Sequence, residues 1–313
     1  MNPPVVAVID IGSNSIKVLV ATRAPDGGVQ PLKFRTIDAR ISAGLSRAAP
    51  RLSEDGMARG LEAIQSLLSD VVPFAPSRVV LVATSAVRDA QNGPEFRERV
   101  RASTSHAIRI LSGAEEANLI GSGLTCDPAL AALQDFYVFD LGGGSLECLA
   151  FRGRQVRQTA SLQLGCVRLM ETFVADPTAP AAPTLAAQIA AHCAAVVPSS
   201  GFAFDLPPGS VAIGTGGTVT TVRAILAAQD GISFDATSPD VSVDTMRRQF
   251  RALGAMTLTD RRQVAGLPAP RADVFPTALA TLIAVAGLGN FSAFRNSVYN
   301  LRFGLARAAL DAL

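Results

Sequence analysis

The pattern that decides the fold occurs twice, as Val8-Ile9-Asp10-Ile11-Gly12-Ser13-Asn14-Ser15-Ile16-Lys17 and as Val138-Phe139-Asp140-Leu141-Gly142-Gly143-Gly144-Ser145-Leu146-Glu147. Each copy has an apolar strand, then Asp-x-Gly-x-x-Ser, then a second apolar strand. Strands joined by a turn rich in Gly, Ser and Asn are typical of β-hairpins. The two aspartates are 130 residues apart, which is about the length of one lobe. The repeat therefore predicts two similar lobes that each begin with a hairpin.

The composition of the two turns suits the binding of an anion. Glycine lets backbone N–H groups approach an anion closely, and serine hydroxyls donate further hydrogen bonds. We expect the phosphate-binding residues of the turns to be Ser13, Asn14, Gly143, Gly144 and Ser145. The alternative is that both turns are tight hairpin connections without a ligand. The aspartate at the same place in both copies favours the anion-binding interpretation.

Helices and strands alternate along the rest of the chain. Apolar side chains at helical spacing predict a helix over 53–72, and the run at 79–83 predicts a buried strand. Further helices are expected at 94–103, 183–197, 218–228, 243–254 and 276–288, with a short strand at 108–111. This order is typical of an α/β protein with mixed sheets flanked by helices. We expect lobes at 1–122 and 123–296, with a carboxy-terminal helix at 297–313 joining the first lobe and the active site in the cleft between them.

Composition excludes several classes of protein. Hydrophobic residues make up 49% of the 313 residues, which is sufficient for packed cores, yet no run approaches the ~18 apolar residues of a membrane span. The apolar opening lacks a basic leader, so a cytoplasmic protein is expected. The four cysteines lack Cys-x-x-Cys spacing, which favours reduced, buried thiols over zinc or disulfides. A net charge of +2, two tyrosines and no tryptophan argue against nucleic-acid binding.

Taken together, the motifs resemble those of the exopolyphosphatase/guanosine pentaphosphate phosphohydrolase family, within the actin and hexokinase superfamily. The matching segments are Ala7 to Ser15, Ala83 to Ala90, Ser112 to Ala117, Phe139 to Glu147, Ser161 to Gly165 and Gly214 to Thr218, with weaker matches at Arg271 to Val274 and Leu301 to Gly304. The resemblance implies two actin-like (ribonuclease H-like) lobes. Longer members carry an additional carboxy-terminal region resembling an HD-type domain, so a short, two-lobe member is expected here.

Two adjacent carboxylates are candidates for a catalytic base. Ser112-Gly113-Ala114-Glu115 fits a capping box, which predicts that Glu115 turns back to the start of a helix. Glu116 then faces elsewhere, and the family resemblance marks it as the catalytic residue. The alternative is that both glutamates lie on the helix surface near the favourable end of the dipole.

Acidic residues beside the two glycine turns are candidates for metal binding. Asp140 and Glu147 flank the second turn, and Asp10 holds the equivalent place in the first. Carboxylates such as these bind Mg²⁺ or Mn²⁺ directly or through water, and K⁺ is a further candidate ion. The alternative is that the aspartates only hold the turns by bonding to backbone N–H groups.

Two further segments are expected to bind phosphate. Arg88 follows a strand and a Thr-Ser turn, and the resemblance implies a phosphate contact there, the alternative being an exposed helix arginine. Gly214, Gly216, Gly217 and Thr218 precede a helix whose amino terminus is suited to an anion, although they also fit a plain strand-to-helix connection. His106 and His192 are isolated and receive no role.

The function expected from these residues is exopolyphosphatase activity. The enzyme would release terminal orthophosphate from inorganic polyphosphate by metal-assisted in-line attack of water. The alternatives are a guanosine pentaphosphate 5′-phosphohydrolase, an actin-fold sugar or acid kinase, and a non-catalytic binding protein. A homodimer is expected, and neither nucleic acid nor a membrane is expected as a partner.

Overall fold

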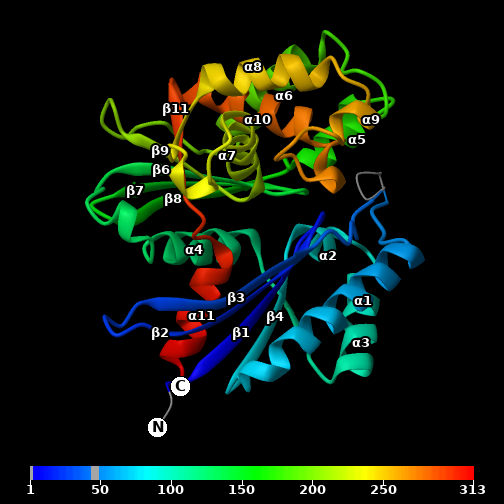
Figure 1. Ribbon diagram of the computed structural model, residues 1–313, viewed down its shortest axis with the longest axis vertical. Coiled ribbons are helices and arrows are strands. Elements are labelled where there is room, and N and C mark those ends of the chain that lie inside the picture. Colours follow the sequence, from blue (N-terminus) through cyan, green and yellow to red (C-terminus); the bar gives the residue numbers. More distant parts are fainter. Residues whose placement is uncertain (1–2, 44–48) are drawn as a thin grey trace. The chain divides into compact units, whose positions relative to one another are not determined.

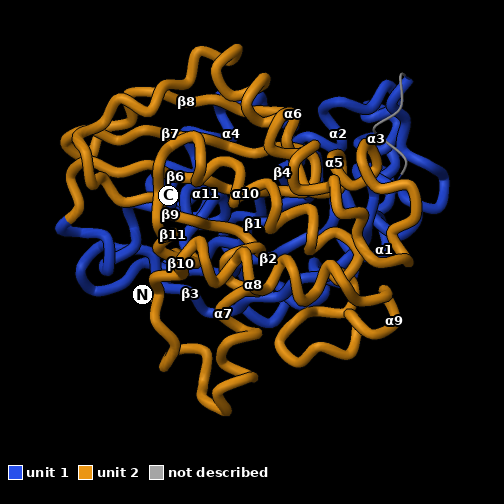
Figure 2. Tube along the Cα trace, turned by 90° about the horizontal axis from the view of Figure 1, so that it is seen from above, with its two compact units in different colours: residues 1–132, 299–313 blue, residues 133–298 orange. Residues whose placement is uncertain are grey.

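The computed structural model describes residues 3–43 and 49–313. The chain forms two compact units, the first from residues 1–132 and 299–313 and the second from residues 133–298 (Figure 2). Each unit contains one sheet flanked by helices (Figure 1). The carboxy-terminal segment therefore returns to the unit that holds the amino terminus.

In the first unit a five-stranded sheet has the order β3-β2-β1-β4-β5. Its strands are β1 (Val5–Ile11), β2 (Ile16–Arg23), β3 (Val29–Ile37), β4 (Arg78–Ala83) and β5 (Ile108–Ile110). Its helices are α1 (Glu54–Val71), α2 (Ser85–Asp89), α3 (Gly93–Thr104), α4 (Gly113–Leu124) and α11 (Leu301–Asp311). The central strand β1 pairs antiparallel with β2 and parallel with β4, so the first Asp-x-Gly turn lies at the carboxyl end of β4.

Local sequence explains where the helices of this unit begin and how they pack. Ser53 caps α1 by accepting a hydrogen bond from the backbone N–H of Gly56. The helix α11 packs against α4 at two glycines, because a Cβ at Gly304 would overlap the carbonyl oxygen of Leu119 and one at Gly123 would overlap that of Asn300. Small residues at this contact let the two helix backbones approach closely and fix the end of the chain in the first unit.

The second unit is built on a six-stranded sheet with the order β10-β11-β9-β6-β7-β8. Its strands are β6 (Phe136–Leu141), β7 (Leu146–Arg152), β8 (Gln155–Leu162), β9 (Val211–Thr215), β10 (Asp240–Ser242) and β11 (Ala293–Asn296). Its helices are α5 (Cys166–Phe173), α6 (Leu185–Ser199), α7 (Gly217–Asp230), α8 (Val243–Gly254), α9 (Leu258–Arg261) and α10 (Phe275–Gly289). β6 pairs antiparallel with β7 and parallel with β9, as β1 pairs with β2 and β4.

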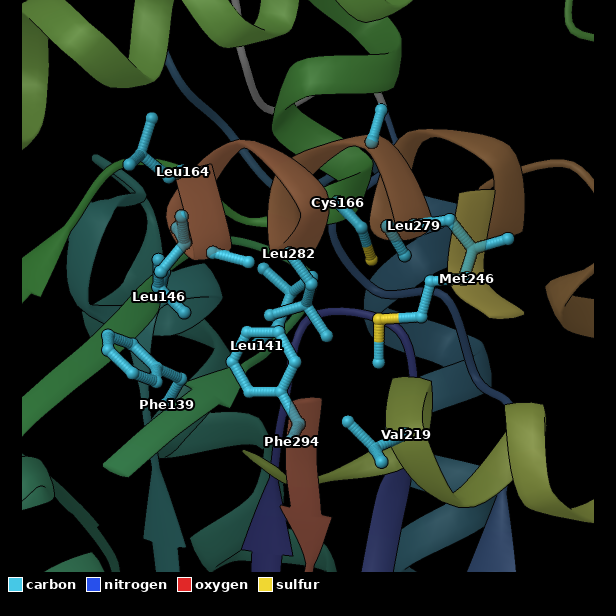
Figure 3. Packing of buried hydrophobic residues seen from close by; sticks show 14 of the residues in the cluster. Phe139, Leu141, Leu146, Leu164, Cys166, Val219, Met246, Leu279, Leu282 and Phe294 are labelled. Carbon is cyan, nitrogen blue, oxygen red and sulfur yellow. The ribbon is translucent and has the colours of Figure 1, made fainter. Parts of the chain in front are cut away.

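A continuous apolar core holds the second unit together (Figure 3). Phe139, Leu141 and Leu146 from the hairpin pack with Leu282 of α10 and Phe294 of β11. These side chains are at most a few per cent exposed, and burying one such side chain contributes roughly 1.5–3 kcal/mol. The strands that carry the second Asp-x-Gly turn are therefore anchored on a rigid base.

The helices and strands expected from the sequence are all present, with shifts of a few residues at their ends. The largest shift is at the carboxy-terminal helix, which begins at Leu301 instead of 297 because the side chain of Asn300 caps it by accepting from the N–H of Arg302. All four cysteines are unpaired, which confirms that they form no disulfide framework. The prediction that all four are buried was wrong for Cys126, which is half-buried. Within 3–43 and 49–313, no helix has the length and apolar character needed to cross a bilayer.

Candidate functional site

The first hairpin turn is held by its carbonyl groups. The N–H of Gly12 bonds to the carbonyl of Ser15 at 3.1 Å and closes the turn. The Ser13 carbonyl accepts from the N–H and the hydroxyl of Ser42, and the Asn14 carbonyl accepts from Arg40 N–H at 2.9 Å. Among the described residues, the amides of positions 13–15 donate to no acceptor. Backbone N–H groups without a protein acceptor are the arrangement expected of an anion site.

The second turn is closed by the equivalent backbone hydrogen bond, but a different segment, the start of α5, bonds to its carbonyl groups. Gly142 N–H bonds to the carbonyl of Ser145 at 3.0 Å, while the start of α5 occupies the carbonyls of the turn. Cys166 N–H donates to Gly142, the amides of residues 167 and 168 donate to Gly143, and Arg168 Nε donates to Gly144 at 2.9 Å. In the part of the chain that the structure describes, the amides of positions 143–145 have no acceptor. In both turns the carbonyl groups are hydrogen-bonded, and among the described residues the backbone amides that follow have no acceptor.

Asp140 and Glu147 lie directly opposite each other across β6 and β7. Side chains in such a pair share one face of the sheet, with Cβ atoms about 5 Å apart, and two like charges there repel each other. Glu147 is only 2% exposed, and its Oε1 accepts a hydrogen bond from the Ser161 hydroxyl at 2.8 Å. In the first hairpin the equivalent register pairs Asp10 with Lys17. The second hairpin therefore concentrates negative charge at a place where the first is balanced.

The glycine turn after β9 adjoins this pair of acids. Thr215 is the register partner of Asp140, and Gly216 follows with φ of 81°. A Cβ at Gly216 would overlap Asp140 Oδ1, so only glycine fits beside the carboxylate. The structure thus brings together Asp140, Glu147 and Gly216, which the sequence placed in separate motifs.

Arg271 is a site residue that sequence reasoning did not assign. Its guanidinium lies against Gly217, where a Cβ would overlap Nη1, and its buried Nε has no hydrogen-bond partner among the described residues. A guanidinium at the amino terminus of a helix strengthens an anion site. The available signal was the weak motif match at Arg271-Ala272-Asp273-Val274.

The capping box predicted at the start of α4 is confirmed. Glu115 Oε2 accepts from the N–H of Ser112 at 2.8 Å, and Ser112 Oγ accepts from the N–H of Glu115. These bonds to Ser112 lower the pKa of Glu115 below its ordinary value. Glu116 instead turns inward and is 6% exposed, so the alternative that both glutamates lie on the helix surface is wrong.

Glu116 forms an ion pair with Arg88 from α2. Arg88 Nη1 lies 2.9 Å from Glu116 Oε2 and also donates to the carbonyl of Leu111 at 3.0 Å. The interpretation of Arg88 as an exposed helix arginine is therefore wrong, because its guanidinium is fixed on the acid 28 residues away. The pair orients the carboxylate that the sequence analysis selected as the base.

The first turn and α2 are neighbours within the first unit. The hydroxyls of Ser13 and Ser85 lie 3.2 Å apart, and Ser85 is the first residue of α2. Asp10 lies at the end of β1, where burial raises the pKa of its carboxyl and the charges of Lys17 and Arg302 partly offset that rise. A buried carboxyl opposite a lysine is a weaker candidate for holding a metal than the two acids of the second hairpin.

The chain matches the Ppx/GppA phosphatase family over residues 19–311. The chain belongs to this family. Two curated relatives are named guanosine-5′-triphosphate,3′-diphosphate pyrophosphatase. The protein from Vibrio vulnificus (strain YJ016) is 29% identical over all of this chain and 60% of its own length, and that from Aeromonas salmonicida (strain A449) is 31% identical over 97% and 59%. The chain therefore spans about 60% of the length of these relatives.

Solved structures of Ppx/GppA proteins share the fold. An exopolyphosphatase from Cytophaga hutchinsonii superposes with a TM-score of 0.87 at 23% identity, covering 99% of this chain and 98% of its own. The Aquifex aeolicus family member has a TM-score of 0.75 at 22% identity, with the same coverage. The predicted α/β fold with two actin-like lobes is confirmed by this likeness.

Asp140 and Glu147 are the acids of this Ppx/GppA member that lie in position to hold a metal ion together. Within the described ranges there is no group of three or more His, Cys, Asp and Glu side chains that could enclose an ion. Mg²⁺ is usually held by one or two carboxylates together with water and phosphate oxygens. The cross-strand pair of Asp140 and Glu147 fits such an ion, and its repulsion would be relieved by one.

Proposed function

We propose that this chain is a phosphoanhydride hydrolase that releases terminal orthophosphate from inorganic polyphosphate. The observation that carries the proposal is the pair of matching turns, whose carbonyls are bonded to the protein and whose amides remain available as donors. Such turns bind phosphate through fixed N–H groups. Membership of the Ppx/GppA phosphatase family supports the same reaction class.

The roles of the side chains follow from the chemistry. Glu116 accepts a proton from the attacking water as the water oxygen bonds to the terminal phosphorus, and the bond from phosphorus to the bridging oxygen breaks. Arg88 keeps the Glu116 carboxylate in place and offers its guanidinium to phosphate oxygens. The turn residues Ser13 and Asn14, with Gly143, Gly144 and Ser145, bind phosphate oxygens.

A second set of groups offsets the charge of the phosphate chain. Asp140 and Glu147 hold Mg²⁺ or Mn²⁺, which when bound neutralises charge on phosphoryl oxygens. Gly216 and Gly217, with Arg271 beside them, bind a further phosphate. Asp10, beside the first turn, is a further acid that contributes to metal binding in this proposal. A requirement for K⁺, a homodimeric state and a cytoplasmic location belong to the same proposal.

The names of the two curated relatives favour guanosine pentaphosphate as a second candidate substrate. The two curated relatives carry names that describe hydrolysis of guanosine pentaphosphate. Removal of the γ-phosphate from that nucleotide breaks the same type of bond and would use the same carboxylate and turns. The two substrates differ in whether a nucleoside must be accommodated beside the phosphates.

A phosphate-release panel tests the proposal and separates the substrates. Purified protein with Mg²⁺ is given short polyphosphate, long polyphosphate, guanosine pentaphosphate, or ATP with and without glucose. We expect orthophosphate from polyphosphate and little from ATP. Preference for guanosine pentaphosphate would select the second substrate, and transfer from ATP to glucose would contradict the hydrolase proposal.

Glu116→Gln tests the assigned base. The amide cannot accept the proton, so we expect a loss of turnover of about 10²–10⁴-fold while polyphosphate binding persists. The matched control is Glu115→Gln on the neighbouring residue, which should weaken the helix cap by about 1 kcal/mol and leave turnover nearly unchanged. Turnover of Glu116→Gln at the wild-type rate would remove Glu116 from the role.

A further inference from the structure

The second unit contains a pocket of about 650 Å³ away from its glycine turns. It lies at the start of β9 and β11, where Val211 and Ala293 line it. β11 and β6 both run parallel to β9, so their amino ends share one edge of the sheet. Gly216 follows the other end of β9, roughly 16 Å from Val211 at the usual rise per strand residue. The pocket is therefore distinct from the site at Asp140 and Glu147.

Three aromatic residues form the aromatic wall of this pocket: the half-buried Phe204 and Phe291, and Tyr137, which is only 3% exposed. The ring centroid of Phe291 lies 5.4 Å from that of Tyr137 and 5.7 Å from that of Phe204. The Tyr137 hydroxyl accepts from the N–H of Leu206 at 2.7 Å, and the Phe291 ring packs directly on Gly289. These contacts hold the rings before any ligand arrives. A preformed aromatic wall suits a flat ring, because stacking then costs little ordering of side chains.

The charged residues of the lining neutralise each other. Arg295 Nε and Nη2 lie 2.8 and 3.0 Å from the two carboxylate oxygens of Asp240, which makes a bidentate pair. The guanidinium fork is therefore already used, and a phosphate would have to displace Asp240. The lining also includes the polar residues Ser210, Asn290 and Ser292, and the Ser210 hydroxyl, which donates to the Pro207 carbonyl at 2.7 Å, keeps its capacity to accept. The chemistry favours an uncharged ligand with polar groups at one side.

We propose that this pocket binds a planar, uncharged heteroaromatic compound that carries hydroxyl groups, of which a purine nucleoside is the natural representative. Its volume lies within the range of about 300–1,000 Å³ that is usual for small-molecule sites. The ring system stacks on the aromatic wall, and the sugar hydroxyls donate to Asp240, as carboxylates do in many nucleoside sites. This site is independent of the proposed phosphate chemistry.

Isothermal titration of the full chain with adenosine tests the proposal. We expect saturable binding of adenosine, no binding of ribose, and no gain in affinity for adenosine monophosphate, since the lining has no unpaired cation to receive a phosphate. A specific site should bind adenosine with a Kd of about 1 mM or tighter. Absence of binding at about 5 mM adenosine therefore overturns the proposal. Equal binding of ribose, or binding of the monophosphate that is more than about tenfold tighter (~1.4 kcal/mol), overturns it as well.

Ala293→Phe locates the binding. Ala293 lies two residues before Arg295 on β11, so both side chains point to the same face and a phenyl ring would fill the pocket. We expect at least about tenfold weaker adenosine binding (~1.4 kcal/mol). The matched control is Ala187→Phe at an exposed position of α6, which should bind as wild type does. Thermal unfolding checks that both variants fold.

A competition experiment separates this pocket from the phosphate site. Adenosine binding should be unchanged by saturating polyphosphate, because the two ligands occupy opposite ends of β9. Displacement of adenosine by polyphosphate, or full binding by Ala293→Phe, would overturn the assignment to this pocket. If polyphosphate is not hydrolysed at all, the titrations with adenosine still decide the pocket on their own.

Discussion

The two hairpins have the same backbone and opposite electrostatics. Both turns close with an N–H to carbonyl bond of 3.0–3.1 Å from the glycine to the serine three residues later. Opposite the aspartate, the first hairpin has Lys17 and the second has Glu147. The shared feature is a set of backbone donors, and the different feature is the charge of the strand partner. A duplicated turn therefore has the same backbone donors in both units, while only the second hairpin places two carboxylates opposite each other.

The largest effect is expected from giving the second hairpin the charge pattern of the first. Glu147→Lys places an ammonium group opposite Asp140. The ammonium balances the charge of Asp140 in place of a metal ion, and the variant loses one of the two carboxylates that would hold the ion. We expect loss of metal-dependent phosphate release by about 10³-fold or more, since metal and positioned donors supply several kcal/mol of charge stabilisation. Phosphate release and Mn²⁺ binding by titration are the measurements.

Ser161→Ala is the control for that variant. It removes only the hydrogen bond to Glu147 Oε1 and keeps both carboxylates. A loss of at most about 10–150-fold is expected, because one hydrogen bond to a charged group contributes about 1.5–3 kcal/mol. If Glu147→Lys kept metal-dependent turnover, the comparison between the hairpins would have no bearing on metal binding.

A smaller effect is expected from Gly216→Ala, which tests whether the turn after β9 must leave room for the Asp140 carboxylate. The new Cβ would overlap Asp140 Oδ1 and push the carboxylate aside, so turnover should fall about 10–100-fold. Gly231→Ala is the matched control, since Gly231 also has positive φ and has open space where a Cβ would go. Both variants carry backbone strain of about 1–3 kcal/mol, and only the first should change kinetics. Equal kinetics in the two variants would show that the position of Asp140 is unimportant.

The smallest effect is expected from a substitution at Cys148, a buried position where the second hairpin has a thiol and the first has Val18. Cys148 pairs with Phe139 as Val18 pairs with Ile9, so Cys148→Val makes the second hairpin resemble the first. The change should alter the free energy of unfolding at pH 7 by less than about 1 kcal/mol, because a buried thiol packs as a small apolar group. Urea denaturation provides the measurement.

The same variant has a pH signature. Burial raises the pKa of Cys148 well above its ordinary value of 9.0, so the folded protein keeps the thiol neutral while the unfolded chain ionises it. The wild-type protein therefore loses stability as pH rises above 9.0 and gains nothing below it. Cys148→Val should lose less stability between pH 9 and 10.5. Some loss remains, because burial also raises the pKa of Cys193 to about 11. An unchanged pH dependence would contradict the assignment.

Much of the fold was accessible from local patterns. The repeated Asp-x-Gly-x-x-Ser runs predicted both hairpins, and the capping-box pattern alone distinguished Glu115 from Glu116. Such features depend on neighbours within a few residues, where spacing and residue type leave few alternatives. The metal pair was partly accessible, because Asp140 and Glu147 flank one turn, but their exact opposition required the strand register.

Contacts between distant segments were less accessible. The ion pair of Arg88 and Glu116, and the placement of Arg271 on Gly217, join residues from different helices and loops. No local signal gives the direction in which such side chains point, since packing of whole elements sets it. The sequence by itself determined two hairpins with Gly- and Ser-rich turns, a capped helix carrying two adjacent acids, and an α/β architecture. Only the tertiary structure decided which side chains meet, because side-chain contacts across elements depend on sheet order and on close approaches at glycine that local sequence does not encode.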